Sequence, residues 1–454
     1  MNIAQKAQKI KRFSQLNLPF KFDNQTVSSN VTFSYLEAFK SIINFRGLIA
    51  NKIGYQKPNN AKFTTVDIID YLVDATILGY SKFQHMDDLR QDQVFRQIKD
   101  SDLPSEKACR DLLKALPEES LKEIRELNKD LLATQAKNEN PREVMLDFDD
   151  TVCTVFGNQE GAKCGYNPRY HGRPSFKEKV GMLGQTHELL NLTLESGNHH
   201  SNHNFLEFFK ECINMLPASW YLKRIRADRG FFDQSTLEYC EENDYEYVVK
   251  AKMQKGVQKI IDYVNDNPRQ HPWTPISKAF SVAEITVPLP AWSKARRFIF
   301  VRKSLPKVND KQMILFDEFT YEYQAIVTNI DYMTPEEIFH DYNQRCNVEN
   351  KIDELKQGFA FDQNSQTNYK CNELFMLIKM IAYNLHNWFK RGILPPEVRH
   401  HEMPTIRRLF YKVAGNMVGN GRYRHIRFAP NKLLERMISY IQQFLNHFRK
   451  TVII

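Results

Sequence analysis

Residues 138–151 read "NENPREVMLDFDDT", and the character of the chain changes there. Asn140-Pro141 interrupts the preceding pattern, because proline lacks a backbone donor and restricts the residue before it. "EVMLDF" then has the composition of a strand. Since side chains alternate along a strand, Asp147 and Asp149 share one face while apolar residues take the other. The stretch therefore predicts the first strand of a sheet with acidic groups on one face.

The residues before this strand are predicted to be mostly helical. Apolar residues recur at helical spacing in "VTFSYLEAFKSIINFRGLIANKIG", "TVDIIDYLVDATILGY" and "SLKEIRELNKDLLATQ". "LPSEKACRDLLKAL" adds a helix that begins after a serine cap. A pair of helices that contacts DNA and an ordinary helical bundle are both compatible with this pattern. We expect residues 1–140 to form a helical domain for DNA binding or assembly.

The residues after the strand alternate between strand and helix patterns. Two more strands ("KVGMLGQT", "ELLNLTLESG"), a helix, the strand "YLKRIRADRGF", another helix and the strand "YEYVVKAK" follow in order. This order predicts a mixed sheet with helices on its faces. We expect an α/β core over 141–252 and 326–395, interrupted by a β-rich insertion over 253–325 and followed by a basic C-terminal region over 396–454. Within the core, "CNELFMLIKMIAYNLHNWFKRG" is predicted to be an amphipathic helix.

Composition narrows the class of protein and of partner. In 454 residues there is no run of 18 apolar residues and no secretory h-region, and seven scattered cysteines fit a reducing cytoplasm. The net charge is +9, and residues 390–454 hold thirteen basic residues against three acidic ones. A basic region on a near-neutral body favours a polyanionic partner such as nucleic acid, although charge alone also fits an ordinary basic protein.

A second informative stretch is "DYNQRCNVENKIDELKQGF", residues 341–359. On a helix, Tyr342, Arg345, Glu349 and Lys356 fall within roughly 60° of one another and form one stripe. The apolar residues of the same segment form the neighbouring stripe, which is the expected core face. Taken alone, the charged stripe is as compatible with a solvated helix face as with a functional site.

Three acidic positions suggest a metal site. Asp149 lies on one face of a strand, "IRADRGF" ends another strand at Asp228, and Glu349 lies on the charged helix stripe. Functional groups of α/β sheets collect at strand ends. Carboxylates that converge there repel one another unless a cation compensates them, and Mg²⁺ prefers such oxygen ligands. Two such ions serve phosphodiester chemistry.

These segments resemble a known family. "LDFDDT", "GYNPRYHGRPSF", "RADRGF" and "YNQRCNVENKIDELK" are similar to motifs of DDE transposases of bacterial insertion sequences, most closely the insertion-sequence 1380 family within the group that carries a Y-R-E-K motif. The N-terminal "DDLRQDQVFRQI" also resembles that family, so the resemblance covers most of the chain. It implies a ribonuclease H-like catalytic core and places the cytoplasmic protein at bacterial DNA.

The resemblance also implies a mechanism. The enzyme would cut at transposon terminal inverted repeats and join the 3′ ends to target DNA, within a homodimer that pairs two ends of double-stranded DNA. The catalytic and metal ligands would be Asp149, Asp228 and Glu349, holding two Mg²⁺, for which Mn²⁺ can substitute. Arg345 would clamp a phosphate. The other implied DNA contacts are Tyr342, Lys356, Arg169 and Arg173, with Lys177 and Lys179 as further candidates.

Several assignments stay open at the level of sequence. The family pattern of Asp, any residue, then Thr or Ser selects Asp149 with Thr151, and Asp147 is the second choice on the same face. Trp292 or Trp273 of the insertion could hold a flipped base, although an ordinary buried tryptophan is the more common arrangement. "HHSNH", with His199, His200 and His203, invites a zinc site, but no fourth ligand stands at a suitable spacing, which favours a polar loop.

The main rival function is a ribonuclease H-like, structure-specific nuclease that cuts DNA without strand transfer. It would use the same carboxylates. The insertion and the large helical N-terminal region favour the transposase. A DNA-binding protein without catalysis would leave the acidic triad unexplained, and a glycosidase with paired carboxylates would leave the basic stripe unexplained.

Overall fold

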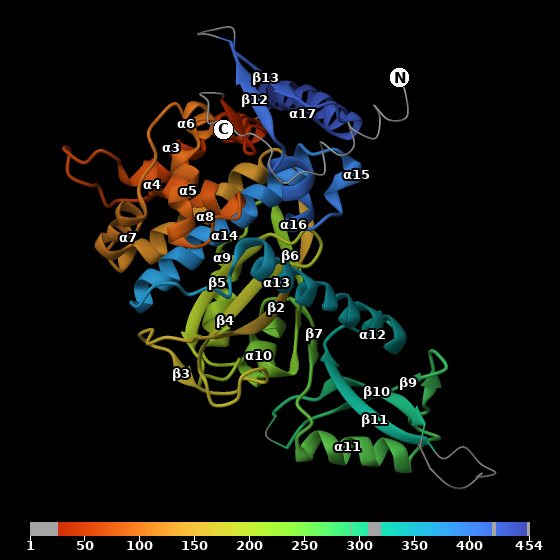
Figure 1. Ribbon diagram of the computed structural model, residues 1–454. Helices are drawn as coiled ribbons and strands as arrows, with labels where there is room; N and C mark the ends of the chain where they lie inside the picture. The colour runs from red at the N-terminus through yellow and green to blue at the C-terminus, as the bar shows by residue number, and fades with distance from the viewer. Residues whose placement is uncertain (1–25, 291, 307–318, 420–423, 452–454) are drawn as a thin grey trace, which may run out of the picture.

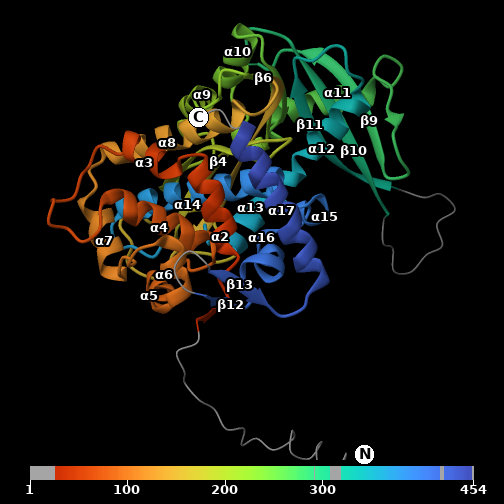
Figure 2. The same ribbon diagram turned by 90° about the horizontal axis from the view of Figure 1, so that it is seen from above.

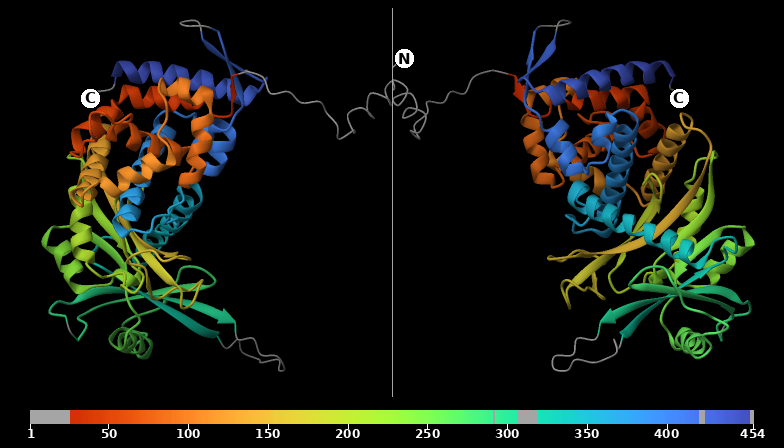
Figure 3. Two further views of the ribbon diagram at one scale, coloured as in Figure 1. Left: turned by 60° about the vertical axis from the view of Figure 1, so that its left-hand side comes forward. Right: turned by 90° about the vertical axis from the view of Figure 1, so that its right-hand side faces the viewer.

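The computed structural model describes residues 26–290, 292–306, 319–419 and 424–451. Figure 1 shows a helical body above a mixed sheet, with the strands of the insertion at the lower right. The views in Figure 3 show the N-terminal (red to orange) and C-terminal (blue) helices gathered at one end and the sheet at the other. No helix of the described residues is long and apolar enough to cross a membrane.

The core sheet is formed by β2 (Arg142–Thr154), β4 (Pro174–Leu183), β5 (Leu189–Ser196), β6 (Trp220–Ala227) and β7 (Glu246–Lys250). β4 pairs antiparallel with both β2 and β5, while β6 pairs parallel with β2 and β7 pairs parallel with β6. The order β5-β4-β2-β6-β7 is that of a ribonuclease H-like core. The predicted mixed α/β fold is therefore confirmed. A short strand, β3 (Lys163–Cys164), adds to the edge of β4.

The two faces of β2 differ as its alternating sequence predicts. Phe148 is fully buried and packs against Phe205 and Phe209 of α9 (Phe205–Asn214), with ring centroids 4.9 and 5.4 Å away. A second helix, α10 (Gln234–Glu242), connects β6 to β7 and shares this hydrophobic cluster. Burying such aromatic side chains stabilises the sheet by about 2 kcal/mol each. The face of β2 that carries Asp147 and Asp149 lies opposite.

The insertion extends the core sheet. It contains β8 (Thr274–Pro275), β9 (Phe280–Val287), β10 (Arg296–Pro306) and β11 (Phe319–Thr328), and β11 pairs antiparallel with β7. The result is one ten-stranded sheet. The insertion begins with a helix, α11 (Lys255–Asp266), where the sequence predicted only strands and turns. Its buried side chains Val257, Ile261 and Val264 recur at helical spacing, a signal that the short segment obscured.

The N-terminal and C-terminal regions form one helical body. Figure 2 shows the N-terminal helices (red to orange) beside the C-terminal elements (blue). β1 pairs with β12, and both ends of the chain contribute to one hydrophobic cluster. The elements are β1 (Val27–Ser28), α2 (Phe33–Ile42), α3 (Phe45–Lys52), α4 (Thr65–Ile77), α5 (Phe83–Gln91), α6 (Gln93–Lys99), α7 (Glu106–Ala115), α8 (Glu119–Ala136), α15 (Pro396–Arg399), α16 (Met403–Ile406), a π-helical turn (Arg407–Tyr411), β12 (Gly415–Val418), β13 (His425–Phe428) and α17 (Lys432–Thr451).

The helix α14 (Tyr369–Gly392) is buried on almost all sides, whereas its sequence predicted an amphipathic helix. It contacts α4, α7 and α8 of the helical body and β5 of the sheet. Its polar side chains have partners inside the protein, which makes their burial possible. Lys379 donates to the carbonyl oxygens of Ala360 and Gln363, and Asn384 donates to the carbonyl oxygen of Leu189. This helix therefore joins the helical body to the catalytic sheet.

One partly buried histidine predicts how stability depends on pH. His187 lies in the turn between β4 and β5, and burial lowers its pKa to about 4. Because this pKa is below the ordinary value of the unfolded chain, the unfolded state binds the proton more strongly, and stability falls as the pH falls from about 6.5 to 4. The wild type should lose unfolding free energy when the pH falls from 7 to 5. We expect this loss to be smaller in His187→Asn by about 1 kcal/mol. Urea unfolding at both pH values measures this difference.

Asparagine is the suitable replacement because His187 has a left-handed backbone with φ of 64°. His340→Asn is the matched control, since that histidine is mostly exposed on the surface of a helix. Equal acid sensitivity of the wild type and His187→Asn would contradict this role of His187.

Candidate active site

Two of the predicted carboxylates lie side by side where the parallel pairing of β2 and β6 ends. The parallel pairing of β2 and β6 continues to Phe148 and Ala227, so the next residues, Asp149 and Asp228, lie beside each other. Asp149 is largely buried and Asp228 is partly exposed. Asp228 immediately precedes a short 3₁₀ turn (Arg229–Phe231) at the end of β6. The structure thus brings both residues together, although β2 continues beyond Asp149 to Thr154 while β6 ends just before Asp228.

The third carboxylate joins this site from a helix with an interruption. The segment predicted as one helix consists of α12 (Pro335–Gln344) and α13 (Cys346–Phe359), which meet at Arg345. There the amide of Arg345 bonds to the carbonyl of Tyr342, and the amide of Val348 bonds to the carbonyl of Arg345. The tighter turn directs Arg345 and Glu349 toward Asp149 on β2. The apolar stripe of α13 is buried, as predicted.

Arg345 joins the carboxylates in the structure. Its Nη1 donates to Oδ2 of Asp149 at 3.1 Å, and its Nη2 donates to Oε1 of Glu349 at 2.8 Å. The hydroxyl of Tyr342 donates to Oδ1 of Asp228 at 3.4 Å. Tyr342 and Arg345 are both buried, whereas the Glu349 side chain is more than half exposed. The sequence predicted phosphate contacts for Tyr342 and Arg345, and here both contact the carboxylates instead.

Charge and burial make this site unusual. Burial, together with the neighbouring charges of Asp150 and Asp228, raises the pKa of Asp149 to about 6 against the lowering effect of Arg345. Burial also raises the pKa of Tyr342, so its phenol stays protonated. Burial opposes the charge of Arg345, but Asp149, Tyr342 and Asp228 together outweigh it and raise the pKa of the guanidinium. The site therefore gathers negative charge that requires a cation.

These residues fit a divalent metal by the chemistry of their donor atoms. Asp149, Asp228 and Glu349 offer only carboxylate oxygens, which hard ions such as Mg²⁺ prefer. The guanidinium of Arg345 already bridges two of the three carboxylates. The exposed side chain of Glu349 leaves this site open to solvent, so that an ion can enter from that side.

The neighbouring aspartates have other partners. Asp147 is fully buried and receives two hydrogen bonds from Arg226, at 2.6 and 2.7 Å. Asp150 points to the other side of β2 and lies 3.4 Å from Nζ of Lys177. Asp149 is the member of this run whose side chain faces Arg345. This arrangement favours Asp149 over Asp147 as the first metal ligand, in the same order as the sequence motif predicts, and the assignment stays a prediction.

A cavity of about 1050 Å³ adjoins the carboxylates. Asp228 and Lys356 line it together with Arg169 from the loop before β4. Arg173 is exposed on the same loop, beside the ring of Phe156. Six basic side chains line the cavity, against three acidic ones; the basic residues are Lys82, Arg110, Arg169, Lys177, Arg229 and Lys356. Such a charge distribution suits a nucleic-acid backbone.

Lys179 does not suit the DNA contact that the sequence suggested. It is fully buried, and its Nζ donates to Oε1 of Glu195 at 2.8 Å. Lys177 is also buried, although it lines the cavity. Alternation along β4 places Lys177 and Lys179 on one face. β5 and the turn that follows it cover Lys179.

The two tryptophans of the insertion are partly buried against other side chains of the protein. Trp292 packs against Phe232 and Phe298 with ring centroids 5.4 and 6.0 Å away, and the guanidinium of Arg296 lies over its ring. Trp273 packs against Tyr323, and its Nε1 donates to Asn265. Contact with a flipped base stays a prediction for both residues.

The histidine-rich turn gains a ligand that the sequence analysis missed. His199 and His203 lie close to Glu195 of β5, while His200 is exposed and outside this group. The sequence contains a signal for this group, because Glu195, His199 and His203 follow one another at steps of four residues. It was overlooked because the glutamate belongs to the preceding strand.

The chain was compared with known proteins. The family model described as Transposase DDE domain group 1 matches residues 11–450. No curated protein matches it in sequence. Among solved structures, a piggyBac transposase synaptic complex with hairpin DNA is similar at 12% identity, covering 94% of this chain and 85% of that chain with a TM-score of 0.45. The Drosophila P element transposase strand transfer complex has 10% identity, 46% coverage of each chain and a TM-score of 0.23.

The family model spans nearly the whole chain, from the helical N-terminal region through the carboxylate-bearing sheet to α17. The expectation of a DDE transposase is thereby confirmed at the level of the family. The chain belongs to the DDE transposases of group 1, metal-dependent polynucleotidyl transferases that cleave DNA and transfer its strands.

Proposed function

We propose that this transposase cuts DNA at the terminal inverted repeats of an insertion sequence and joins the freed 3′ ends to target DNA. The observation that carries the proposal is the convergence of Asp149, Asp228 and Glu349 around Arg345. The Y-R-E-K spacing of Tyr342, Arg345, Glu349 and Lys356 supports an assignment to the insertion-sequence 1380 family. Because the reaction joins two ends, a homodimer would act in the paired complex.

We infer that the three carboxylates hold two Mg²⁺, or Mn²⁺ in its place. When bound, such a pair activates the attacking oxygen and stabilises the leaving oxygen of an in-line displacement. In the first step, water attacks the phosphodiester at the end of the element and releases a 3′ hydroxyl. In the second, this hydroxyl attacks a target phosphodiester, so that one phosphorus–oxygen bond forms as another breaks. No side-chain nucleophile is required.

The remaining residues of the site would orient the reacting strand. Arg345 holds Asp149 and Glu349 in the structure, and its two donor nitrogens could pass to a phosphate once metal neutralises the carboxylates. Tyr342 orients Asp228 by its hydroxyl. Lys356, Arg169 and Arg173 would bind neighbouring phosphates along the cavity. The N-terminal region, residues 1–140, and the basic C-terminal region, residues 396–454, would bind and pair the ends.

The test is a joining reaction. Protein, Mg²⁺, labelled DNA of the inverted repeat from the flanking sequence and a supercoiled target plasmid are incubated together. We expect labelled ends to become covalently joined to the plasmid, and no product without a divalent ion. Cleaved ends without joined products would favour the rival structure-specific nuclease.

Lys356 gives a quantitative prediction for DNA binding. It lines the cavity beside Asp228, and no acidic side chain among the described residues forms an ion pair with it. We expect Lys356→Ala to weaken binding to end DNA and to lower the slope of log affinity against log salt by about one counterion. Fluorescence anisotropy over a salt series measures both. Lys351→Ala is the control, because Lys351 pairs with Glu354 and does not line the cavity. An unchanged slope would remove Lys356 from the DNA contacts.

A further inference from the structure

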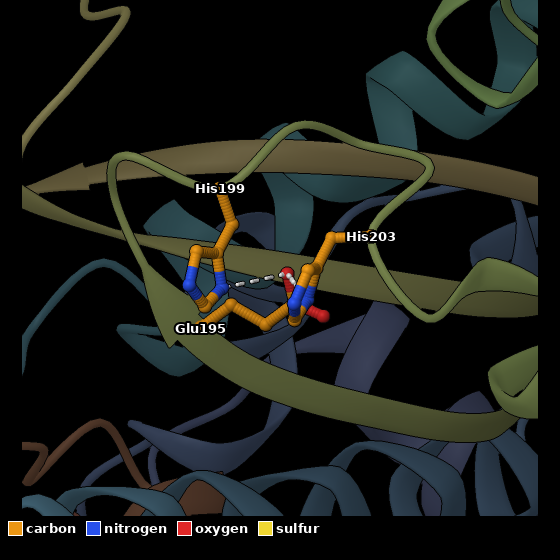
Figure 4. Close-up of side chains that lie close together, drawn as sticks. All are labelled: Glu195, His199 and His203. Atoms are coloured by element: carbon orange, nitrogen blue, oxygen red, sulfur yellow. Dashed lines mark ion pairs between the residues drawn. The ribbon is translucent and has the colours of Figure 1, made fainter.

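Three metal-ligating side chains meet at the turn between β5 and α9, apart from the proposed catalytic carboxylates. Glu195 is the penultimate residue of β5, and His199 and His203 lie in the turn that follows. One ligand atom from each of the three residues lies within 4.8 Å of the other two. In Figure 4 the two imidazole rings and the carboxylate converge beneath the turn.

The distances suit ligands of a shared ion better than hydrogen bonds. Oε2 of Glu195 lies 3.6 Å from Nδ1 of His199 and 3.6 Å from Nδ1 of His203. Both separations exceed the range of an N–H···O hydrogen bond. Two ligand atoms held about 2.1 Å from one tetrahedral zinc ion stand about 3.4 Å apart. A single carboxylate oxygen thus faces two ring nitrogens at close to the spacing of a coordination shell.

Two of these ligand atoms are buried without a hydrogen-bond partner among the described residues. Oε2 of Glu195 and Nδ1 of His199 are buried and form no hydrogen bond within the described part of the chain. Buried polar atoms without partners are uncommon in folded proteins. The other oxygen of Glu195 accepts a hydrogen bond from the fully buried Lys179, at 2.8 Å. Lys179 therefore fixes the carboxylate and leaves Oε2 directed at the histidines, which is how supporting residues orient metal ligands.

We propose that Glu195, His199 and His203 form a binding site for one zinc-type transition-metal ion. Two imidazoles and one carboxylate are common zinc ligands, with the fourth position taken by water. The partial exposure of both histidines leaves that position open to solvent. Mg²⁺ and Ca²⁺ suit the site poorly, because it offers a single carboxylate and the ammonium of Lys179 stands beside it.

The ion would fix a turn that borders the active site. Ser201, between the two histidines, lines the same cavity as Asp228. It also packs against Gly230, where an added Cβ atom would lie 2.7 Å from the hydroxyl oxygen of Ser201. Linking His199 to His203 through a metal would restrain the turn beside the strand end that carries Asp228. The proposed metal ion would fix the position of this turn and would not contact the reacting phosphate.

Co²⁺ titration of tag-free protein in excess Mg²⁺ tests the proposal. Mg²⁺ occupies sites made only of oxygen, and Co²⁺ in a four-coordinate site with nitrogen ligands absorbs strongly in the visible. We expect one equivalent of Co²⁺ to produce this absorption and one equivalent of Zn²⁺ to abolish it. His199→Ala and His203→Ala should each weaken binding at least tenfold, while His200→Ala, in the same turn, should bind like the wild type. Circular dichroism checks that every variant is folded.

Hydrogen exchange gives an independent readout of the role. Zn²⁺ should slow amide exchange in residues 197–204 of the wild type and of His200→Ala, but not of His199→Ala. A folded wild type that takes up no Co²⁺ at micromolar concentration would overturn the proposal. Equal loss of binding in His200→Ala and His199→Ala would overturn the assigned ligands. Neither result bears on DNA joining with Mg²⁺, which tests the catalytic site.

Discussion

Asp228→Asn and Glu349→Gln should each reduce DNA cleavage and strand joining on the order of 10³-fold or more, because residues that act as one catalytic unit lose most of the activity when any member is removed. Each substitution keeps the shape of the side chain and removes the charge that a divalent ion requires. Asp228 and Glu349 reach the site from a strand end and from a helix, so their loss does not act through one shared local element. Gel assays with labelled end DNA measure both steps.

The control for Glu349→Gln is Asp353→Asn, which removes an exposed carboxylate one turn along the same helix. It should keep wild-type cleavage within about twofold, since exposed substitutions away from the site change little. Isothermal titration should also record weaker Mg²⁺ binding for Asp228→Asn and Glu349→Gln than for Asp353→Asn. Normal cleavage by either site variant would rule out that residue as a metal ligand.

The core sheet could be predicted because its signals are local. The strands β2, β4, β5, β6 and β7 each follow a change in hydrophobic period, with Asp149 on β2 and Asp228 directly after β6. The extension of the sheet depends instead on a distant pairing between β11 and β7, and no periodicity reports which strands pair. The burial of α14 depends in the same way on α4, α8 and β5, which surround it.

The sequence predicted which residues belong to the candidate site better than it predicted which of these residues contact one another. Between Pro335 and Gly358 the sequence contains no residue that breaks a helix, so spacing predicts a single helix. The interruption falls at Arg345, whose guanidinium reaches Asp149 on β2. That contact joins residues 196 positions apart in the sequence. The metal-ligating group at Glu195 was overlooked for a related reason, since its members belong to two different elements.

Asp147→Asn should lower the free energy of unfolding by about 3–5 kcal/mol, because the buried guanidinium of Arg226 loses its closest charged partner and keeps, among the described residues, only Asp341, at 3.7 Å. The side chains of Asp147 and Arg226 are both 1% exposed, and they form two hydrogen bonds. Burial raises the pKa of Asp147 in opposition to Arg226, so the carboxylate depends on this partner for its charge. Urea unfolding followed by circular dichroism measures the change.

A double-mutant cycle separates this pair from the catalytic site. Arg226→Met alone should be as destabilising as Asp147→Asn, because it leaves the buried carboxylate of Asp147 without a cationic partner. The combination Asp147→Leu with Arg226→Met should recover much of the loss, since it removes both charges. Gly184 limits what can be placed here, because an added Cβ atom would lie 2.5 Å from Nη2 of Arg226 and 2.7 Å from Oδ2 of Asp147. An additive cycle would mean that the two side chains do not act as a pair.

A comparison of Asp147→Asn with Asp149→Asn decides which aspartate of "DFDD" binds metal. Asp149→Asn should abolish cleavage and leave the unfolding free energy nearly unchanged or raised, because burial disfavours the charge of this carboxylate when no metal is bound. Asp147→Asn should lose activity only in proportion to the protein that unfolds, and cooling should restore it. A folded but inactive Asp147→Asn, beside an active Asp149→Asn, would reverse the two roles. The sequence alone allows both assignments, because alternation places both side chains on one face. Arg226 separates them, because it neutralises Asp147 and leaves Asp149 to a metal.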